Sequence, residues 1–198
     1  MPQVARDPPL VRARPLADCD EVWAYFDSGI KYNPRGFPDR VDLGVVLFEP
    51  NPTIASESIM ASVVSCGLGQ AIGSWDLELV RVWNRSKQGI LRTRWVRGAQ
   101  VYDLIAARGA ALHLRTNSYT GRVRFIGDGD QVIRYLNGDD SQLRITVDGD
   151  DIGAMIRRGI LQDTKGLASC TWNWVPSAEN LADKWNKRTV STRPPRVV

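Results

Sequence analysis

The chain has 198 residues, of which 43% are hydrophobic and 24% are charged, proportions that exclude a chain that is disordered throughout. No stretch approaches the roughly 18 consecutive apolar residues that a membrane-spanning helix needs. The formal net charge of +4 is compatible with a nucleic-acid partner but does not require one.

Residues 1–20 are dominated by Pro, Arg and Asp, which predicts a flexible N-terminal arm without the apolar core of a secretory signal. The three cysteines lie far apart and show no metal-ligand spacing, which indicates a reducing compartment. We therefore expect an intracellular protein, in the cytoplasm, the nucleus or an organelle, that is not secreted and has no membrane partner.

The first strong pattern is a pair of strands joined by a long turn. Residues 21–29, EVWAYFDSG, are rich in aromatic and β-branched side chains and end in Ser-Gly, which predicts a strand. Residues 31–40 are rich in Pro, Gly, Asn and Asp and predict a turn. Residues 41–50, VDLGVVLFEP, predict a second strand closed by Pro50, so the three segments together predict a hairpin with an elongated loop.

The next segment, residues 51–98, is harder to divide into elements. Three glycines would break a long helix in residues 51–75, which favours a strand and a short helix there, and residues 77–95 favour one or two strands. Residues 81–97 hold two tryptophans and no acid, with six basic residues: Arg81, Arg85, Lys87, Arg92, Arg94 and Arg97. Basic side chains interleaved with aromatic ones are typical of contacts with nucleic acid, although a solvated strand face would give the same pattern.

The second half of the chain alternates helices and strands. The apolar spacing of residues 99–114 is the strongest helix signal. The remaining expected elements are a strand over 121–129, a helix over 130–138, a helix over 150–162, a strand over 168–176 and a last helix that opens at Asp183. A hairpin, a third strand and this alternation predict an α/β domain with both parallel and antiparallel pairing.

Four acidic residues fall where these strands end or these helices begin: Asp27, Asp103, Asp128 and Asp183. Such ends converge on one edge of an open α/β sheet. Carboxylates gathered there repel one another unless cations neutralise them, which predicts a site for two Mg²⁺ (or Mn²⁺) ions and phosphodiester cleavage. Each Asp taken alone is equally typical of a turn or of a first helical turn.

The motifs, in this order, resemble the ribonuclease H type 1 family, and especially its reverse-transcriptase-like, retroelement-associated form. YFDSGIKYNPRGFPDRVDLGVVLFEP (25–50) is similar to the family's opening hairpin, and AQVYDLIAARGAAL (99–112) to its Glu-bearing helix. VRFIGDGDQVIRYLNG (123–138) is similar to the strand that ends in Gly-Asp and the helix after it. WNWVPSAENLAD (172–183) is similar to the final strand and turn.

The resemblance implies an α/β fold with a mixed five-stranded sheet, its first three strands antiparallel, flanked by helices. The ribonuclease H-like domain would span residues 21–188, with 51–98 as an enlarged insertion and third-strand region. The arm 1–20 would precede it and a basic tail, 189–198, would follow it.

The resemblance also implies that Asp27, Asp128 and Asp183 are catalytic metal ligands. Asp130 is a rival of Asp128, because the Gly-Asp pair is doubled in GDGD. A different alignment would draw residues 61–75, ASVVSCGLGQAIGSW, into the first strand pair, which then has no Asp and implies an inactive site. We favour Asp27, because the hairpin, the turn and the following strand all agree.

The fourth ligand has two candidates, because the family Glu can be aligned with either Gln100 or Asp103. They lie one turn apart on the same helix face. Charge favours Asp103, since a neutral amide does not replace an anion between two dications. The six basic residues of the 81–97 segment, with Asn33 of the Asn-Pro turn, are the candidate nucleic-acid contacts.

The activity implied by the resemblance is metal-dependent hydrolysis of the RNA strand of an RNA–DNA hybrid. The alternative is a catalytically degenerate module on the same fold that binds nucleic acid. A third option is a structural or interaction domain in a larger ribonucleoprotein or retroelement-derived assembly. A complete acid set favours the nuclease and Gln100 in the metal position favours degeneracy, so the sequence leaves open whether the protein is an enzyme.

Overall fold

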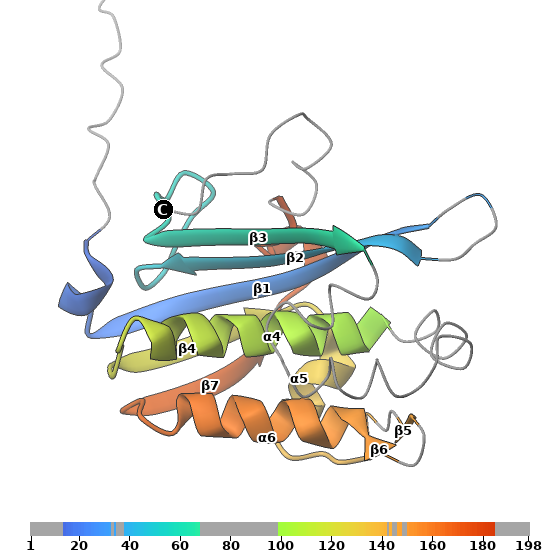
Figure 1. The fold of residues 1–198 in the computed structure, drawn as a ribbon. Helices are drawn as coiled ribbons and strands as arrows, with labels where there is room; N and C mark the ends of the chain where they lie inside the picture. Colours follow the sequence, from blue (N-terminus) through green and yellow to red (C-terminus); the bar gives the residue numbers. More distant parts are fainter. Residues whose placement is uncertain are drawn as a thin grey trace, which may run out of the picture.

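A computed structural model describes residues 14–32, 34, 38–67, 99–141, 143, 146–147 and 150–184 of the chain. Its centre is a five-stranded sheet with the strand order β3-β2-β1-β4-β7 (Figure 1). The strands are β1 (Glu21–Tyr32), β2 (Pro38–Phe48), β3 (Met60–Gly67), β4 (Arg122–Gly127) and β7 (Ser169–Trp174).

The sheet is mixed in direction. β1 and β2 are antiparallel, as are β2 and β3, whereas β4 runs parallel to β1 and β7 runs parallel to β4. The predicted mixed sheet, with three antiparallel strands on one side, is therefore confirmed. β1, β4 and β7 share a direction, so their carboxyl ends point the same way, and β1 continues beyond the level at which β4 and β7 end.

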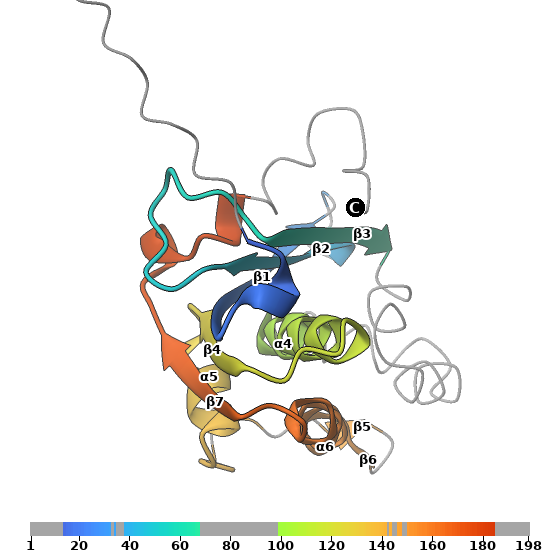
Figure 2. The same ribbon diagram turned by 90° about the vertical axis from the view of Figure 1, so that its left-hand side faces the viewer.

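Helices α4 and α6 lie side by side against one face of this sheet, as the two views show (Figures 1 and 2). The helices are α4 (Ala99–Thr116), α5 (Asp130–Leu136) and α6 (Ile152–Thr164), with the 3-10 turns η1 (Leu16–Asp18) and η2 (Ser177–Glu179). A separate pair of short strands, β5 (Thr146–Val147) and β6 (Asp150–Asp151), precedes α6. None of the described helices is long and apolar enough to cross a membrane.

The predicted elements that fall on described residues are present, with shifted ends, whereas the strands expected over 77–95 lie outside the described residues. β1 continues beyond its predicted end at Gly29, because its ladder with β2 runs on through Lys31 opposite Arg40. β3 falls within residues 51–75, where a strand and a short helix were expected, and residues 68–75 lie outside the described residues. α6 begins at Ile152, two residues after the predicted start, because the Asp151 side chain accepts the N–H of Ala154 (3.0 Å) and caps the helix there.

The main core lies between α4 and the sheet. Alternate residues of β1, such as Ala24 and Phe26, point to α4, which buries a face that includes Tyr102, Leu104 and several alanines. A smaller apolar cluster occupies the opposite face of the sheet, around Tyr25 of β1. Neighbouring residues of β1 therefore serve two different layers, as the alternation of a strand requires.

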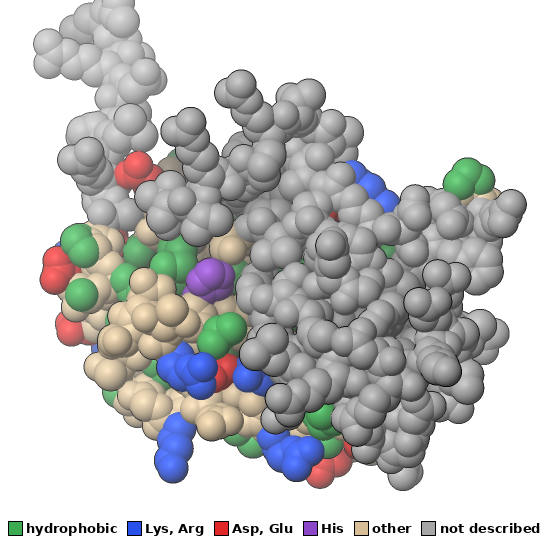
Figure 3. Space-filling view, viewed as in Figure 1, with side chains coloured by type: hydrophobic (Ala, Val, Ile, Leu, Met, Phe, Trp, Pro, Cys, Tyr) green, Lys and Arg blue, Asp and Glu red, His purple; other side chains and the backbone are tan. Residues whose placement is uncertain are grey.

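A buried ion pair joins the two long helices. The carboxylate of Asp163 of α6 forms ion pairs with Arg108 (2.5 Å) and Arg115 (2.6 Å), both on α4, and its side chain is fully buried. The space-filling view shows Lys and Arg side chains over α6 and along its border with α4 (Figure 3). Two arginines around one buried carboxylate fix the relative position of the helices, because removing either side leaves a buried charge without its counter-charge.

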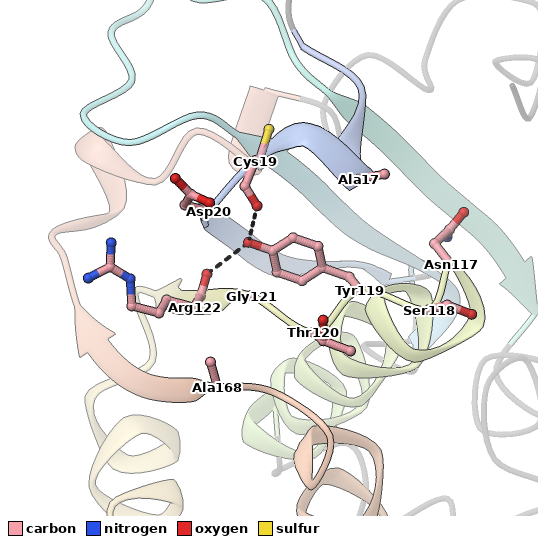
Figure 4. A pocket seen from close by; sticks show the side chains of 10 residues that line it. All are labelled: Ala17, Cys19, Asp20, Asn117, Ser118, Tyr119, Thr120, Gly121, Arg122 and Ala168. Carbon is pink, nitrogen blue, oxygen red and sulfur yellow. Dashed lines mark hydrogen bonds between the residues drawn. The ribbon is translucent and has the colours of Figure 1, made fainter.

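Part of the predicted N-terminal arm is attached to the domain. Cys19 is buried, and its carbonyl accepts a hydrogen bond from the Tyr119 hydroxyl (3.0 Å; Figure 4). The N–H of Arg122 bonds to the carbonyl of Asp20 (2.9 Å). A pocket of about 570 Å³ opens beside these contacts, at the amino end of β4 and away from the carboxyl edge of the sheet. Residues 1–13 and 185–198 lie outside the described residues.

Candidate functional site

Asp27 and Asp128 stand level with each other on neighbouring parallel strands. The last pair of the β1–β4 ladder is Tyr25 with Ile126. Asp27 lies two residues after Tyr25, and Asp128 lies two residues after Ile126. Asp27 is only 7% exposed. Asp128 therefore follows the carboxyl end of β4, at the edge of the sheet where sites form in open α/β folds. Asp27, which was expected at a strand end, lies instead within β1, opposite Gly44, because the β1–β2 ladder runs on to Tyr32.

Asp103, in the second turn of α4, reaches this edge from the helix layer. The Ser28 hydroxyl donates a hydrogen bond to its carboxylate. The pKa of Asp103 is raised to about 7, mainly by burial and in smaller part by the charge of Asp128, against the lowering effect of the hydroxyl and the backbone N–H of Ser28. Asp103 and Asp128 are thus electrostatic neighbours, and Ser28 links them to the strand that carries Asp27.

The backbone around Asp128 is held from several sides. A Cβ at Gly127 would lie 2.7 Å from the ring of Phe26, so only a glycine lets β1 and β4 approach this closely. The N–H of Val175 donates to the carbonyl of Gly127 (3.0 Å), and the indole N–H of Trp174 donates to the carbonyl of Asp128 (2.9 Å). The position of Asp128 is therefore set by residues of β1 and by the end of β7.

Asp183 is tied to the same edge through Asn180, a residue that sequence reasoning missed as a functional candidate. Asn180 is 3% exposed, and its amide donates to the carbonyl of Phe26 (3.0 Å), the residue before Asp27. The backbone N–H of Asp183 donates to the carbonyl of Asn180 (3.1 Å), and helical residues begin at Asp183, as predicted. The sequence feature that could have identified Asn180 is the Asn-Leu-Ala-Asp run, because a buried Asn in a turn can donate a hydrogen bond to a distant backbone carbonyl.

The side chains of the rival candidates, Gln100 and Asp130, interact with other partners. Gln100 donates from its amide to Gln131 of α5 (3.0 Å), at an exposed position. Asp130 forms an ion pair with Arg134, one helical turn later (3.0 Å). Position therefore favours Asp103 over Gln100, and Asp128 over Asp130.

The alternative alignment of the first strand pair fails on the sheet topology. Residues 61–67, which it would place in that pair, belong to the edge strand β3. β1 is the strand that pairs with both β2 and β4, and it carries Asp27. The proposed nucleic-acid contacts, which are Asn33 and the six basic residues of the 81–97 segment, lie outside the described residues.

The four acids do not form one compact group. Across the described part of the chain, no three His, Cys, Asp or Glu side chains are gathered closely enough to hold a metal ion. Strand alternation explains part of this, since Ser28 points to the α4 face and Asp27 to the opposite face. The donor chemistry nevertheless fits a divalent cation, because a buried carboxyl beside a second acid is most stable as an anion when a cation neutralises it.

Comparisons with known proteins place the fold. No protein-family model matches the chain, and no curated protein sequence matches it. The N-terminal RNase H domain of a protein from Mycobacterium tuberculosis, solved as a fusion with maltose-binding protein, matches with a TM-score of 0.52 and 11% identity, over 86% of this chain and 99% of that one. RNase H1 from the halophilic archaeon Halobacterium salinarum matches with a TM-score of 0.50 and 15% identity, over 83% and 92% of the two chains. At these identities the likeness shows the fold, so the chain has a ribonuclease H-like fold.

Proposed function

We propose that this protein is a divergent, retroelement-type ribonuclease H that hydrolyses the RNA strand of RNA–DNA hybrids with Mg²⁺ or Mn²⁺. The observation that carries the proposal is the buried Asp103 carboxyl, held by Ser28 of β1 beside Asp128, which directly follows β4. The ribonuclease H-like fold supports the same activity, because the two solved structures reported above are RNase H proteins. Fold alone does not assign an activity, so the proposal rests on the site.

In the proposed mechanism the ligands are Asp27, Asp103, Asp128 and Asp183. Two ions bound there would activate a water molecule and stabilise the leaving oxygen of the phosphodiester. Ser28 orients the Asp103 carboxylate, and the N–H groups at the end of β7 hold the backbone of Asp128. Asn180 keeps the turn before Asp183 against β1. Asp103 is one methylene shorter than the Glu of the family, and its bond to Ser28 keeps it at the edge.

The proposed substrate is an RNA–DNA hybrid, recognised by its backbone and by the 2′-hydroxyls in its minor groove. The net charge of +4 favours binding to a polyanion. In this proposal the basic residues of the 81–97 segment and Asn33 make the phosphate contacts. Binding should therefore weaken as salt concentration rises.

The test is cleavage of a hybrid in which each strand carries its own label, with and without Mg²⁺ or Mn²⁺. We expect metal-dependent cutting of the RNA strand alone, and a loss of about 100-fold or more in Asp27→Asn and in Asp183→Asn. Circular dichroism of both variants checks that they remain folded. Cutting of the DNA strand, or equal cutting by wild type and both variants, would contradict the proposal.

A second candidate function is a nucleic-acid-binding module that has lost catalysis. It is favoured by the lack, among described residues, of three acids grouped for a metal ion. The same experiment separates the two candidates. A wild-type protein that binds the hybrid in a salt-dependent manner, without cutting it and without sensitivity to either substitution, is the binding module.

A further inference from the structure

Trp174 combines exposure with a fixed position beside the acids. Trp174 is 51% exposed. Among the described residues two other large apolar residues, Ile54 and Leu161, are also exposed. A single exposed apolar residue is ordinary. What sets Trp174 apart is that its indole N–H donates to the carbonyl of Asp128 (2.9 Å), so the ring is both exposed and held in one orientation.

The ring of Trp174 is not part of the core. Trp172, two residues earlier on the same face of β7, stacks on Phe125 with ring centres 4.2 Å apart and planes at 12°. Trp174 lies opposite Gly127 in the register of β4 and β7, and a glycine offers no side chain to cover the ring. The core therefore ends at Trp172, and the exposed ring that follows has no packing function that would explain its size.

The ring lies on the face of the sheet that α4 covers. Trp172 packs against the main core that contains α4, so the alternation of β7 places Trp174 on that same face. Ser28 is on this face of β1, because its hydroxyl reaches Asp103 of α4. Trp174 thus borders the edge at which Asp103 and Asp128 meet.

The chemistry that this ring offers is stacking or apolar contact. Its N–H is already used by the Asp128 carbonyl, so a ligand meets the flat, apolar face of the indole. Nucleobases and ribose rings are the ligands that suit such a face next to an acidic site, and every base can stack irrespective of sequence. Because the ring is held by a hydrogen bond, little side-chain freedom is lost when a ligand binds.

We infer that Trp174 binds the nucleic-acid substrate at the acidic edge through the face of its ring, while its N–H positions Asp128. This inference rests on the proposed function and adds a contact residue to that site. The aromatic face and the N–H of Trp174 can be tested separately. Phenylalanine at this position keeps an aromatic face and loses the N–H, whereas alanine loses both.

The first test measures the binding of a fluorescein-labelled RNA–DNA hybrid by fluorescence anisotropy. The buffer contains EDTA so that no cleavage occurs. We expect Trp174→Ala to weaken binding about tenfold and Trp174→Phe to weaken it less than threefold. Trp23→Phe is the matched control, because Trp23 of β1 lies under the guanidinium of Arg124, near the amino ends of the strands. An unchanged affinity in Trp174→Ala would overturn the inference. A loss of affinity in Trp23→Phe as large as the loss in Trp174→Ala would also overturn it.

A second measurement does not depend on the alanine variant folding. Addition of the hybrid should quench part of the tryptophan fluorescence of the wild type, and this part should be missing in Trp174→Phe. Equal quenching in both proteins would overturn the inference. In the cleavage assay, Trp174→Phe should lower kcat without raising KM, because it loses only the bond to Asp128.

The two proposals fail in different ways. A wild type that cuts no hybrid removes the proposed activity, whereas the anisotropy and quenching results decide the role of Trp174 without any turnover. Binding that depends on Trp174 in a protein without cleavage would keep this inference for the binding module.

Discussion

At the scale of single residues, Asp103 is the side chain whose environment is most unusual among the four proposed ligands. Its carboxyl group is buried beside Asp128, and its hydrogen bonds come from Ser28, whose hydroxyl and N–H both favour the charged form. Burial outweighs these bonds, so the pKa of Asp103 is raised to about 7. In the metal-free protein the charged form of this residue is therefore a source of instability.

The pH dependence of stability tests this directly. The pKa of Asp103 in the folded state, about 7, lies above its ordinary value of 3.8, so between these values the folded protein binds a proton that the unfolded chain releases. This residue's stabilising contribution is complete below about pH 4 and is lost as the pH rises to 7, an effect on the order of a few kcal/mol. Urea unfolding in EDTA from pH 4.5 to 8 should show this loss in the wild type and a flatter profile in Asp103→Asn. Parallel profiles for the two proteins would show that the group is not perturbed.

The sequence could rank some of these residues but not all of them. Charge alone favoured Asp103 over Gln100. In the structure Asp103 accepts a hydrogen bond from Ser28 of β1, whereas Gln100 donates one to Gln131. Asp128 and Asp130 could not be separated, because both follow a glycine in GDGD and the difference is an ion pair to Arg134. Asn180 was missed because its partner, the carbonyl of Phe26, is 154 residues away in the chain.

At the scale of elements, the close packing of α4 against α6 depends on one glycine and one ion pair. A Cβ at Gly159 of α6 would lie 1.3 Å from a guanidinium nitrogen of Arg108. Arg108 is the end of a flexible side chain, but it is held there by the buried Asp163 (2.5 Å). The guanidinium can therefore move away only by giving up that ion pair.

A double-mutant cycle tests this packing. Gly159→Ala should destabilise the protein by about 1–3 kcal/mol, because the new methyl group displaces Arg108 from Asp163. In an Arg108→Ala background the same change should be neutral or stabilising by up to about 1 kcal/mol, since alanine is the better helix former. Chemical unfolding of the four proteins measures the coupling. Equal effects of Gly159→Ala in both backgrounds would contradict the described contact.

The elements themselves were predictable where periodicity is strong, as in α4, and their ends were less so. The cap at Asp151 and the continuation of β1 depend on partners that a local pattern does not identify. The buried Asp163 was not a candidate at all, because apolar spacing marks the buried face of a helix and gives no sign of an acid that two arginines neutralise.

At the scale of the whole molecule, the order of strands places the acids. β1 lies at the centre of the sheet with β4 beside it in parallel, so the carboxyl end of β4 lies level with the middle of β1, where Asp27 stands. Asn180 then brings the end of the chain's described part back to β1. Periodicity predicted the mixture of strand directions, whereas the strand count and the antiparallel first three strands came from the resemblance to ribonuclease H. The domain boundaries at 20 and 188 stay predictions.

Cleavage of the strand-labelled RNA–DNA hybrid by Asp128→Asn beside Asp130→Asn decides whether this edge of the sheet is the active site of a nuclease. These two aspartates lie two positions apart in the chain. The charge of Asp128 raises the pKa of Asp103, whereas Asp130 forms an ion pair with Arg134. We predict that Asp128→Asn loses about 100-fold or more of the Mg²⁺-dependent RNA cleavage and that Asp130→Asn stays close to wild type. Equal activity in the two variants, or no cleavage by the wild type, would contradict the claim that this edge of the sheet is the active site of a nuclease.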